Sequence, residues 1–252
     1  MEKKKPGLTR VPSHSGTILH ELILSNNMKD LKRELKRLGK GKTAETLLLK
    51  DRRGKTPLFL AAELKSLDML KQMHKKKGDV HEPDSNGWTP LHVACSNGDL
   101  PVVKFLLEVG EKEGHSDVDK KTVDFSTALH YYVRNKPELQ DRPLYFELLA
   151  KLLGSDRANT SAPNKNGDTP LHVAAVHASE DVVLYLLNND ADVDKQNRFG
   201  EAALHLAARE GRLEVVKLLL EHGATYNLLG DNGTPREVAE DANHLHIANL
   251  LV

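Results

Sequence analysis

Apolar and polar positions alternate along this chain with a helical period that is interrupted at short intervals. Between residues 213 and 220, leucine and valine recur at the spacing of one helix face. Gly211 precedes this stretch and Gly223 follows it, and glycine is favoured at such turns because it adopts a left-handed backbone at little cost. The pattern predicts units made of a helix, a turn, a second helix and another turn.

A seven-residue motif marks the start of the first helix in each unit. It reads TPLHVAA at 169–175, TPLHVAC at 89–95 and AALHLAA at 202–208. Seven copies align and define repeats 1 to 7, with motifs beginning at Thr17, Thr56, Thr89, Thr127, Thr169, Ala202 and Thr234. The successive steps are 39, 33, 38, 42, 33 and 32 residues. Three steps therefore lie at or within one residue of 33.

The motif has the composition of a helix start. A threonine hydroxyl can cap the helix, and a proline such as Pro170 suits the first turn because its missing N–H is not needed there. The alanine pair Ala174 and Ala175 leaves little side-chain volume, so neighbouring helices can approach closely. One unit cannot bury both helical faces alone, and it must therefore stack on its neighbours.

The 33-residue period and the T-P-L-H-x-A signature resemble the ankyrin-repeat family. The resemblance covers residues 16–252. It implies an all-α solenoid of about seven helix-turn-helix units, which begin near 16, 54, 87, 125, 167, 200 and 233 and are joined by short finger turns. Residues 1–15 are expected to form a basic N-terminal arm. The atypical motifs of repeats 1 and 7 are expected to cap the stack.

Three repeats exceed 33 residues. In repeats 1 and 3 the extra residues follow the second helix, within 38–54 and 108–125. The resemblance implies that such insertions lengthen the fingers beside the concave face. Repeat 4 gains residues between its two helices, at 135–143, and has Phe125 where repeats 2, 3, 5 and 6 have glycine and Tyr132 where those repeats have alanine. We therefore expect a loop and an irregular stack at repeat 4, with tolerated insertion as the alternative to a functional role.

Overall charge gives no indication of nucleic-acid binding, because Lys+Arg and Asp+Glu both number 36. The charge is unevenly distributed, since residues 1–77 carry 20 basic and 8 acidic side chains. No segment approaches 18 uncharged apolar residues, so we expect neither a signal peptide nor a membrane span. Cys95 is the single cysteine, which excludes an intrachain disulfide and fits the cytoplasm, with the nucleus as an open alternative.

Catalytic chemistry finds little support in the sequence. The motif histidines are His20, His92, His130, His172 and His205. The resemblance assigns this side chain to hydrogen bonds with backbone near the fingers. Nucleotide-binding, zinc-protease and serine-hydrolase motifs are absent, and Cys95 occupies an alanine position. We therefore expect no enzyme activity, no cofactor and no metal.

The candidate binding residues follow from the position of the motif. The resemblance implies that the residue before each motif and the two after the alanine pair point into a concave groove. Those residues are Lys55, Trp88, Ser96, Asn97, Arg134, Asp168, His177, Glu201, Arg209 and Glu210, with Arg198 and Phe199 at a finger tip. Trp88 is the candidate anchor, because repeat packing does not require an indole there. Ordinary solvated surface is the alternative for each of the others.

The sequence therefore indicates a monomeric, non-catalytic protein-binding module or scaffold, suited to be the targeting part of a larger signalling protein. Its partner segment is expected to be extended or helical, with an apolar residue and some basic ones. The alternative is an adaptor that binds anionic lipid or acidic partners through the basic N-terminal segment. Asn227 lies where the resemblance implies a target of asparaginyl hydroxylation, with a structural turn asparagine as the alternative.

Overall fold

The computed structural model describes residues 16–154 and 158–252, so the expected arm 1–15 lies outside the described residues. The chain forms two compact units. The N-terminal unit ends at Ser85 and the C-terminal unit begins at Asn86. Within the described residues, no helix is both long and apolar enough to cross a membrane.

Helices in pairs make up both units, as the repeat pattern predicts. The N-terminal unit contains α1 (Ile18–Leu24), α2 (Met28–Leu47), α3 (Pro57–Glu63) and α4 (Leu67–His74). The C-terminal unit contains α5 (Pro90–Asn97), α6 (Leu100–Glu113), α7 (Ala128–Tyr132), α8 (Arg142–Leu153), α9 (Pro170–His177), α10 (Glu180–Leu187), α11 (Ala203–Arg209), α12 (Leu213–Glu221), α13 (Pro235–Asp241) and α14 (Leu245–Ala248). The 3₁₀ turns η1 (Leu139–Asp141) and η2 (Ala158–Ser161) flank α8. The described residues thus confirm an all-α fold, with one isolated bridge between Gly230 and Gly233.

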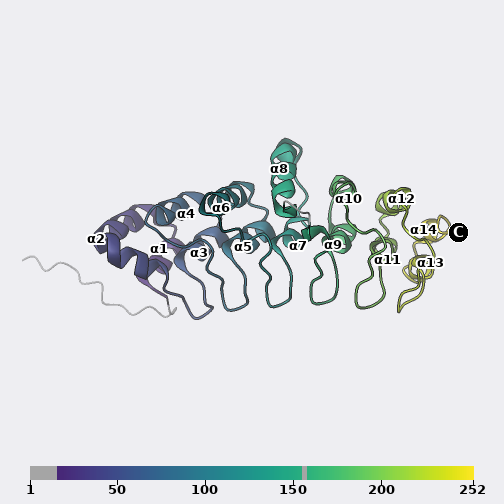
Figure 1. Ribbon diagram of the computed structural model, residues 1–252, viewed down its shortest axis with the longest axis horizontal. Helices are drawn as coiled ribbons and strands as arrows, with labels where there is room; N and C mark the ends of the chain where they lie inside the picture. Colours follow the sequence, from purple (N-terminus) through teal and green to yellow (C-terminus); the bar gives the residue numbers. More distant parts are fainter. Residues whose placement is uncertain (1–15, 155–157) are drawn as a thin grey trace, which may run out of the picture. The chain divides into compact units, whose positions relative to one another are not determined.

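The helices of the C-terminal unit form two rows. Figure 1 shows the first helices of successive repeats side by side, the second helices above them and hairpin-like fingers below. The first helices α9, α11 and α13 pack in sequence. Their alanines are buried to a relative exposure of 0–2%, including Ala174, Ala207 and Ala239, because close helix approach leaves room only for a methyl group.

The insertions of repeats 1 and 3 lengthen helices, which corrects the expectation that they lengthen fingers. Helix α2 continues to Leu47 across a non-helical Gly39, and α6 continues to Glu113. Both extensions keep an apolar face against the core, since Leu47 and Val109 are buried. Amphipathic segments that can bury such a face gain more as helix than as solvated finger.

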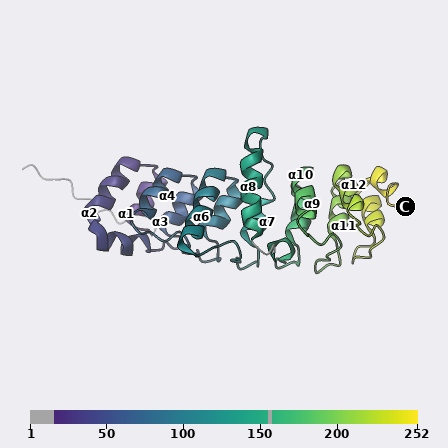
Figure 2. The ribbon, with the colours of Figure 1, turned by 45° about the horizontal axis from the view of Figure 1, so that its top comes forward.

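Repeat 4 departs from the regular geometry, as expected. Its insertion forms the loop between α7 and α8, and Figures 1 and 2 show α8 standing out from the row of second helices. Tyr132 and Tyr145 stack with ring centroids 4.5 Å apart, and both side chains are buried. Phe125 takes the glycine position with φ of 57° and remains 53% exposed.

The two stacked tyrosines also exchange hydrogen bonds. The Tyr132 hydroxyl donates to the Tyr145 carbonyl at 3.1 Å, and the Tyr145 hydroxyl donates to the Tyr132 carbonyl at 3.2 Å. Asn135 fixes the start of the loop, because its Nδ2 donates to the Cys95 carbonyl at 2.7 Å. Repeat 4 is therefore stabilised by these hydrogen bonds of Tyr132, Tyr145 and Asn135, residues that replace the regular pattern of the other repeats.

We expect Tyr132→Phe and Tyr145→Phe each to lower the free energy of unfolding by about 1–2 kcal/mol, because each removes a buried hydrogen bond. Urea denaturation followed by circular dichroism would measure the change. The matched control is Tyr226→Phe, since Tyr226 is 47% exposed. Equal stability of all three variants and the intact chain would contradict a stabilising role for the tyrosine pair.

Candidate functional site

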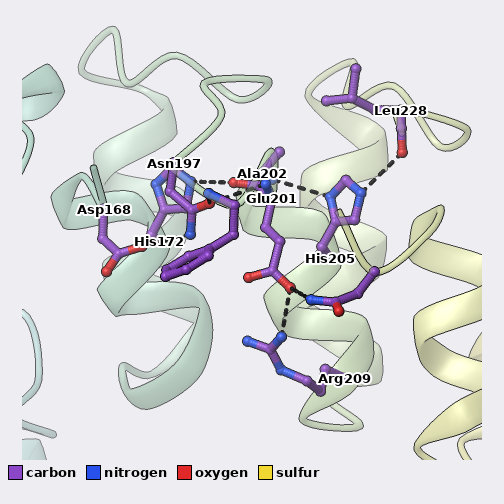
Figure 3. Close-up of polar contacts among 10 residues, drawn as sticks. Asp168, His172, Asn197, Glu201, Ala202, His205, Arg209 and Leu228 are labelled. Atoms are coloured by element: carbon purple, nitrogen blue, oxygen red, sulfur yellow. Dashed lines mark hydrogen bonds and ion pairs between the residues drawn. The ribbon is translucent and has the colours of Figure 1, made fainter. Parts of the chain in front are cut away.

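The motif histidines connect each helix start to the next finger in the C-terminal unit. His172 Nδ1 accepts from the Thr169 amide at 3.1 Å. Because Nδ1 accepts, the proton lies on Nε2, which donates to the Glu201 carbonyl at 2.9 Å. His205 repeats the arrangement with the Ala202 amide and the Leu228 carbonyl (Figure 3). One neutral imidazole thus joins the start of a helix to the finger that follows it.

Burial keeps these imidazoles neutral. Desolvation lowers the pKa of His92, His172 and His205 from the ordinary value, and it lowers that of His130 to about 4. In each ring the hydrogen bond to a finger carbonyl opposes the shift without outweighing it. His20 of the N-terminal unit makes the same contact to the Lys55 carbonyl at 2.9 Å. The expected structural role of the motif histidines is confirmed.

The fingers of the C-terminal unit are also joined near their tips. Each finger donates a backbone N–H to the one before it at 2.7–2.9 Å: Val123 to Asn86, Lys165 to Asp124, Arg198 to Asn166 and Asp231 to Phe199. The fingers are consequently held at both base and tip. Side chains on them are presented by a backbone with little freedom to move.

A pocket of about 190 Å³ lies on α7, α9 and α11, beside the finger bases. Its apolar lining comes from Tyr131, Val173, Val176 and Leu206, and its charged and polar lining includes Arg134, Asp168 and His177. The structure therefore brings together three of the predicted binding residues. Tyr131, Val173 and Leu206 were missed, although they occupy the variable position of T-P-L-H-x-A, which is the sequence signal that could have found them.

Trp88 does take part in repeat packing, which corrects the expectation for this residue. Its ring lies 4.3 Å from that of Tyr131 and 6.2 Å from that of His92, centroid to centroid. The indole is half-buried, because the neighbouring repeat supplies a tyrosine against its face. Through Tyr131 the indole adjoins the pocket, so the two aromatic rings extend the apolar surface toward α5.

The acidic residues predicted for the groove are already held by protein donors. The Glu201 side chain is 5% exposed, and its Oε1 lies 2.6 Å from Arg209 Nη1. Asp168 Oδ1 accepts from Asn197 Nδ2 at 2.8 Å. Figure 3 shows Glu201 directed to Arg209, and Asp168 on the neighbouring repeat. These carboxylates stabilise the site and present less free negative charge than the sequence indicates.

The remaining predicted residues are distributed more widely. Ser96, Arg198, Glu210 and Asn227 are exposed, Asn97 is half-buried, and Phe199 is 47% exposed. Lys55 belongs to the N-terminal unit, where its Nζ lies 2.7 Å from Glu63 Oε1. It lines a pocket of about 370 Å³ there with His20 and Leu60. Hydroxylation of Asn227 stays a prediction.

Comparison of the sequence with models of known protein families identifies the family of this chain. Models of ankyrin repeats match residues 19–117, as three copies, and residues 171–220, as many copies. Together these matches cover more than half of the chain, and they agree with its helix pairs and fingers. The chain belongs to the ankyrin-repeat family.

The proteins with similar sequences have different functions in their names. A probable serine/threonine-protein kinase of Dictyostelium discoideum is 30% identical over 177 residues, which cover 68% of this chain and 20% of the kinase. A probable 26S proteasome regulatory subunit p28 of Saccharomyces cerevisiae is 37% identical over 134 residues, covering 51% of this chain and 53% of the subunit. Human neurogenic locus notch homolog protein 1 is 33% identical over 146 residues, covering 58% of this chain and 5% of that protein. The chain thus spans about half or less of the length of these relatives.

We expect the stability of the C-terminal unit to decrease as pH falls below about 6.5. The unfolded chain binds protons at its histidines near that pH, whereas burial lowers the pKa of four motif histidines in the folded unit. The stabilisation is complete above pH 6.5 and is lost progressively as pH falls through the folded pKa values, which reach about 4 for His130. For His130 alone the loss would be on the order of 2–3 kcal/mol.

Urea denaturation at a series of pH values between 7.5 and 4 would measure this dependence. The Glu34 carboxyl does not account for it, because the hydrogen bond from Arg37 lowers its pKa below the ordinary range and its contribution is lost only at lower pH. As a matched control, His222→Gln replaces an exposed histidine and should leave the slope unchanged. A free energy of unfolding that is constant from pH 7 to 5 would contradict the prediction.

Proposed function

We propose that this chain is a non-catalytic protein-binding module that uses the groove surface of the C-terminal unit. We define the groove surface as the 190 Å³ pocket together with Trp88, Tyr131 and the adjoining finger bases. The supporting observation is the half-buried Trp88–Tyr131 pair beside a pocket that mixes apolar and charged groups. Aromatic anchors within a polar rim are typical of residues that dominate binding energy.

Family membership supports the same function. Ankyrin repeats generally mediate protein–protein interactions, and stacked repeats form extended binding surfaces. The similar proteins include a probable kinase and a probable proteasome regulatory subunit, so whole-protein activity does not follow from the repeats. We propose that the chain acts as a scaffold or as the targeting part of a larger signalling protein, as a monomer in the cytoplasm or nucleus.

The absence of catalysis is part of this proposal. The motif histidines are committed to backbone hydrogen bonds. Cys95 is fully buried, and desolvation raises the pKa of its thiol, so the nucleophilic thiolate is disfavoured. These motif histidines and the single cysteine are thereby occupied in repeat packing.

Affinity capture from cell extract tests the proposal. We expect Trp88→Ala to reduce recovery of specific partners by about tenfold or more, because truncation of an aromatic anchor costs about 2 kcal/mol or more. Trp88→Phe is the matched variant, since it keeps an aromatic ring against Tyr131. Lys217→Ala, at a half-buried position of α12, controls for changes away from the groove.

Trp88→Ala also removes a contact within the stack, so each variant should be compared by circular dichroism and at a temperature where it remains folded. Unchanged recovery with folded Trp88→Ala, together with loss after replacement of residues 135–143, would identify the repeat 4 loop as the binding surface. That result would contradict the groove proposal.

Binding to anionic lipid is the second candidate function, because α2 exposes Lys29, Lys32 and Lys36. The arginines of the same face are neutralised in part. Arg33 pairs with Asp30 at 2.6 Å, and Arg37 pairs with Glu34 at 2.6 Å. The three lysines, which form no ion pair with any residue of 16–154 or 158–252, give a weak surface attraction that salt screens.

We expect weak or no sedimentation of the chain with vesicles containing phosphatidylserine at 0.15 M salt, because each basic residue near the surface contributes only about 1 kcal/mol. Vesicles of phosphatidylcholine are the control. Strong, salt-sensitive sedimentation that disappears when Lys29, Lys32 and Lys36 are changed to glutamate would favour the lipid function over the protein-binding one.

A further inference from the structure

Two repeats neutralise their own groove charges. In repeat 2, Lys55 Nζ lies 2.7 Å from Glu63 Oε1, and in repeat 6, Arg209 Nη1 lies 2.6 Å from Glu201 Oε1. Each ion pair joins the residue before the motif to the residue eight positions later. The two repeats use the same two positions with the charges reversed. The positions therefore determine that an ion pair can form, and either position can carry the positive charge.

Repeats 4 and 5 each have one charged residue and one uncharged residue at these two positions. Repeat 4 has Ser126 before the motif and Arg134 eight positions later, while repeat 5 has Asp168 and Val176 at the corresponding positions. All four residues line the 190 Å³ pocket. The pocket therefore lies where the ion pairing used by repeats 2 and 6 is incomplete.

The two unmatched charges differ in what they contact. Asp168 accepts from Asn197 Nδ2 at 2.8 Å and faces Asn164 Nδ2 at 3.4 Å. Arg134 is exposed, and across residues 16–154 and 158–252 it makes no hydrogen bond or ion pair. The pocket thus presents an unmatched guanidinium, whereas its carboxylate is already bound by two amides.

The surroundings of Arg134 add positive charge. Lys136 on the same turn is exposed. The charged groups that act on His177, which also lines the pocket, are Arg134, Lys136, Arg212 and Glu210. Burial, followed by the charge of Arg134, lowers the pKa of His177. Arg212 is paired with Glu180 at 3.2 Å, so Arg134 and Lys136 are the exposed cations of this part of the groove surface, within a C-terminal unit that is acidic overall.

The size of the pocket restricts its occupant. About 190 Å³ is less than the roughly 300–1,000 Å³ of sites for small-molecule ligands. The apolar lining from Tyr131, Val173, Val176 and Leu206 accompanies the single cation Arg134. A side chain of a partner protein therefore fits this pocket better than a metabolite does.

We propose that this pocket binds an aspartate or glutamate of an extended partner segment, paired with Arg134, while an apolar neighbour of that residue packs on Tyr131 and Val173. A guanidinium can hold a carboxylate through two parallel hydrogen bonds, which supplies orientation as well as attraction. This inference rests on the proposed protein-binding function. It reverses the charge that the sequence indicates for the partner, because Glu201 and Asp168 are engaged within the protein.

Charge complementarity favours a protein carboxylate over nucleic acid. Asp168 and Glu210 lie beside the basic residues, and residues 78–252 carry 28 acidic and 16 basic side chains. A polyphosphate would meet repulsion on either side of Arg134, whereas one carboxylate needs a single cation. Binding of nucleic acid is therefore tested as the competing result in the experiment below.

The experiment selects binding peptides from a random 12-residue phage-displayed library on the intact chain. Synthetic peptides from the enriched sequences, labelled with fluorescein, are then titrated by anisotropy. We expect the enriched sequences to contain aspartate or glutamate next to leucine, isoleucine, valine or an aromatic residue. A single-stranded oligonucleotide, labelled in the same way, is titrated for comparison.

Charge reversal at Arg134 is the decisive variant. We expect Arg134→Glu to weaken the peptides at least about tenfold, and Arg134→Lys to weaken them less, because it keeps the charge but loses the bidentate geometry. The matched control is Arg236→Glu, which reverses an exposed arginine of α13 outside the pocket. Circular dichroism confirms that the variants are folded.

The outcomes separate this inference from the proposed function. Acidic peptides that respond to Arg134→Glu but not to Arg236→Glu support it. Basic or neutral peptides that lose affinity in Trp88→Ala but not in Arg134→Glu overturn it and leave the protein-binding function standing. An oligonucleotide that binds more tightly than every peptide overturns the carboxylate assignment. A library without any enriched sequence overturns both proposals.

Discussion

The hydrogen bond from a neutral imidazole to the backbone of the next finger is the interaction on which this structure depends. In the C-terminal unit the ring accepts from the amide that starts its own helix and donates to a carbonyl of the finger that follows, as His172 does to Glu201. The same side chain thereby caps the helix and positions the finger. Repeat 2 has Phe59 in place of the motif histidine, and phenylalanine cannot make this bond. The boundary between the two units, after Ser85, lies in the finger that follows repeat 2.

The groove chemistry follows from this constraint. Since the fingers are fixed at their bases by imidazoles and near their tips by amides, the residue before each motif has a defined position relative to the residue eight places later. Complementary side chains there neutralise each other, as Glu201 and Arg209 do. Where the complement is serine, as at Ser126 of repeat 4, the charge of Arg134 is left for the solvent or for a partner. A small change in composition can thus alter the groove without altering the fold.

Sequence alone predicted the helix pairs, because capping, glycine turns and apolar spacing are local. It did not predict the pairing of Trp88 with Tyr131, which lie in neighbouring repeats and meet only through the stacking of their helices. Nor did it place the insertions of repeats 1 and 3, since the family pattern favoured fingers while burial of Leu47 and Val109 favoured longer helices. Local signals determine the elements, and contacts between repeats determine the site.

The backbone bonds between fingers give the C-terminal unit a mechanical character. Four amide-to-carbonyl bonds, beginning at Asn86 and ending at Asp231, connect successive fingers near their tips. A force that opens the row of fingers loads these bonds one after another, together with the imidazole bonds at the finger bases. We therefore expect the unit to resist bending that separates its fingers, because such bending has to break these bonds. A segment bound along the fingers would add further contacts between them and increase this resistance.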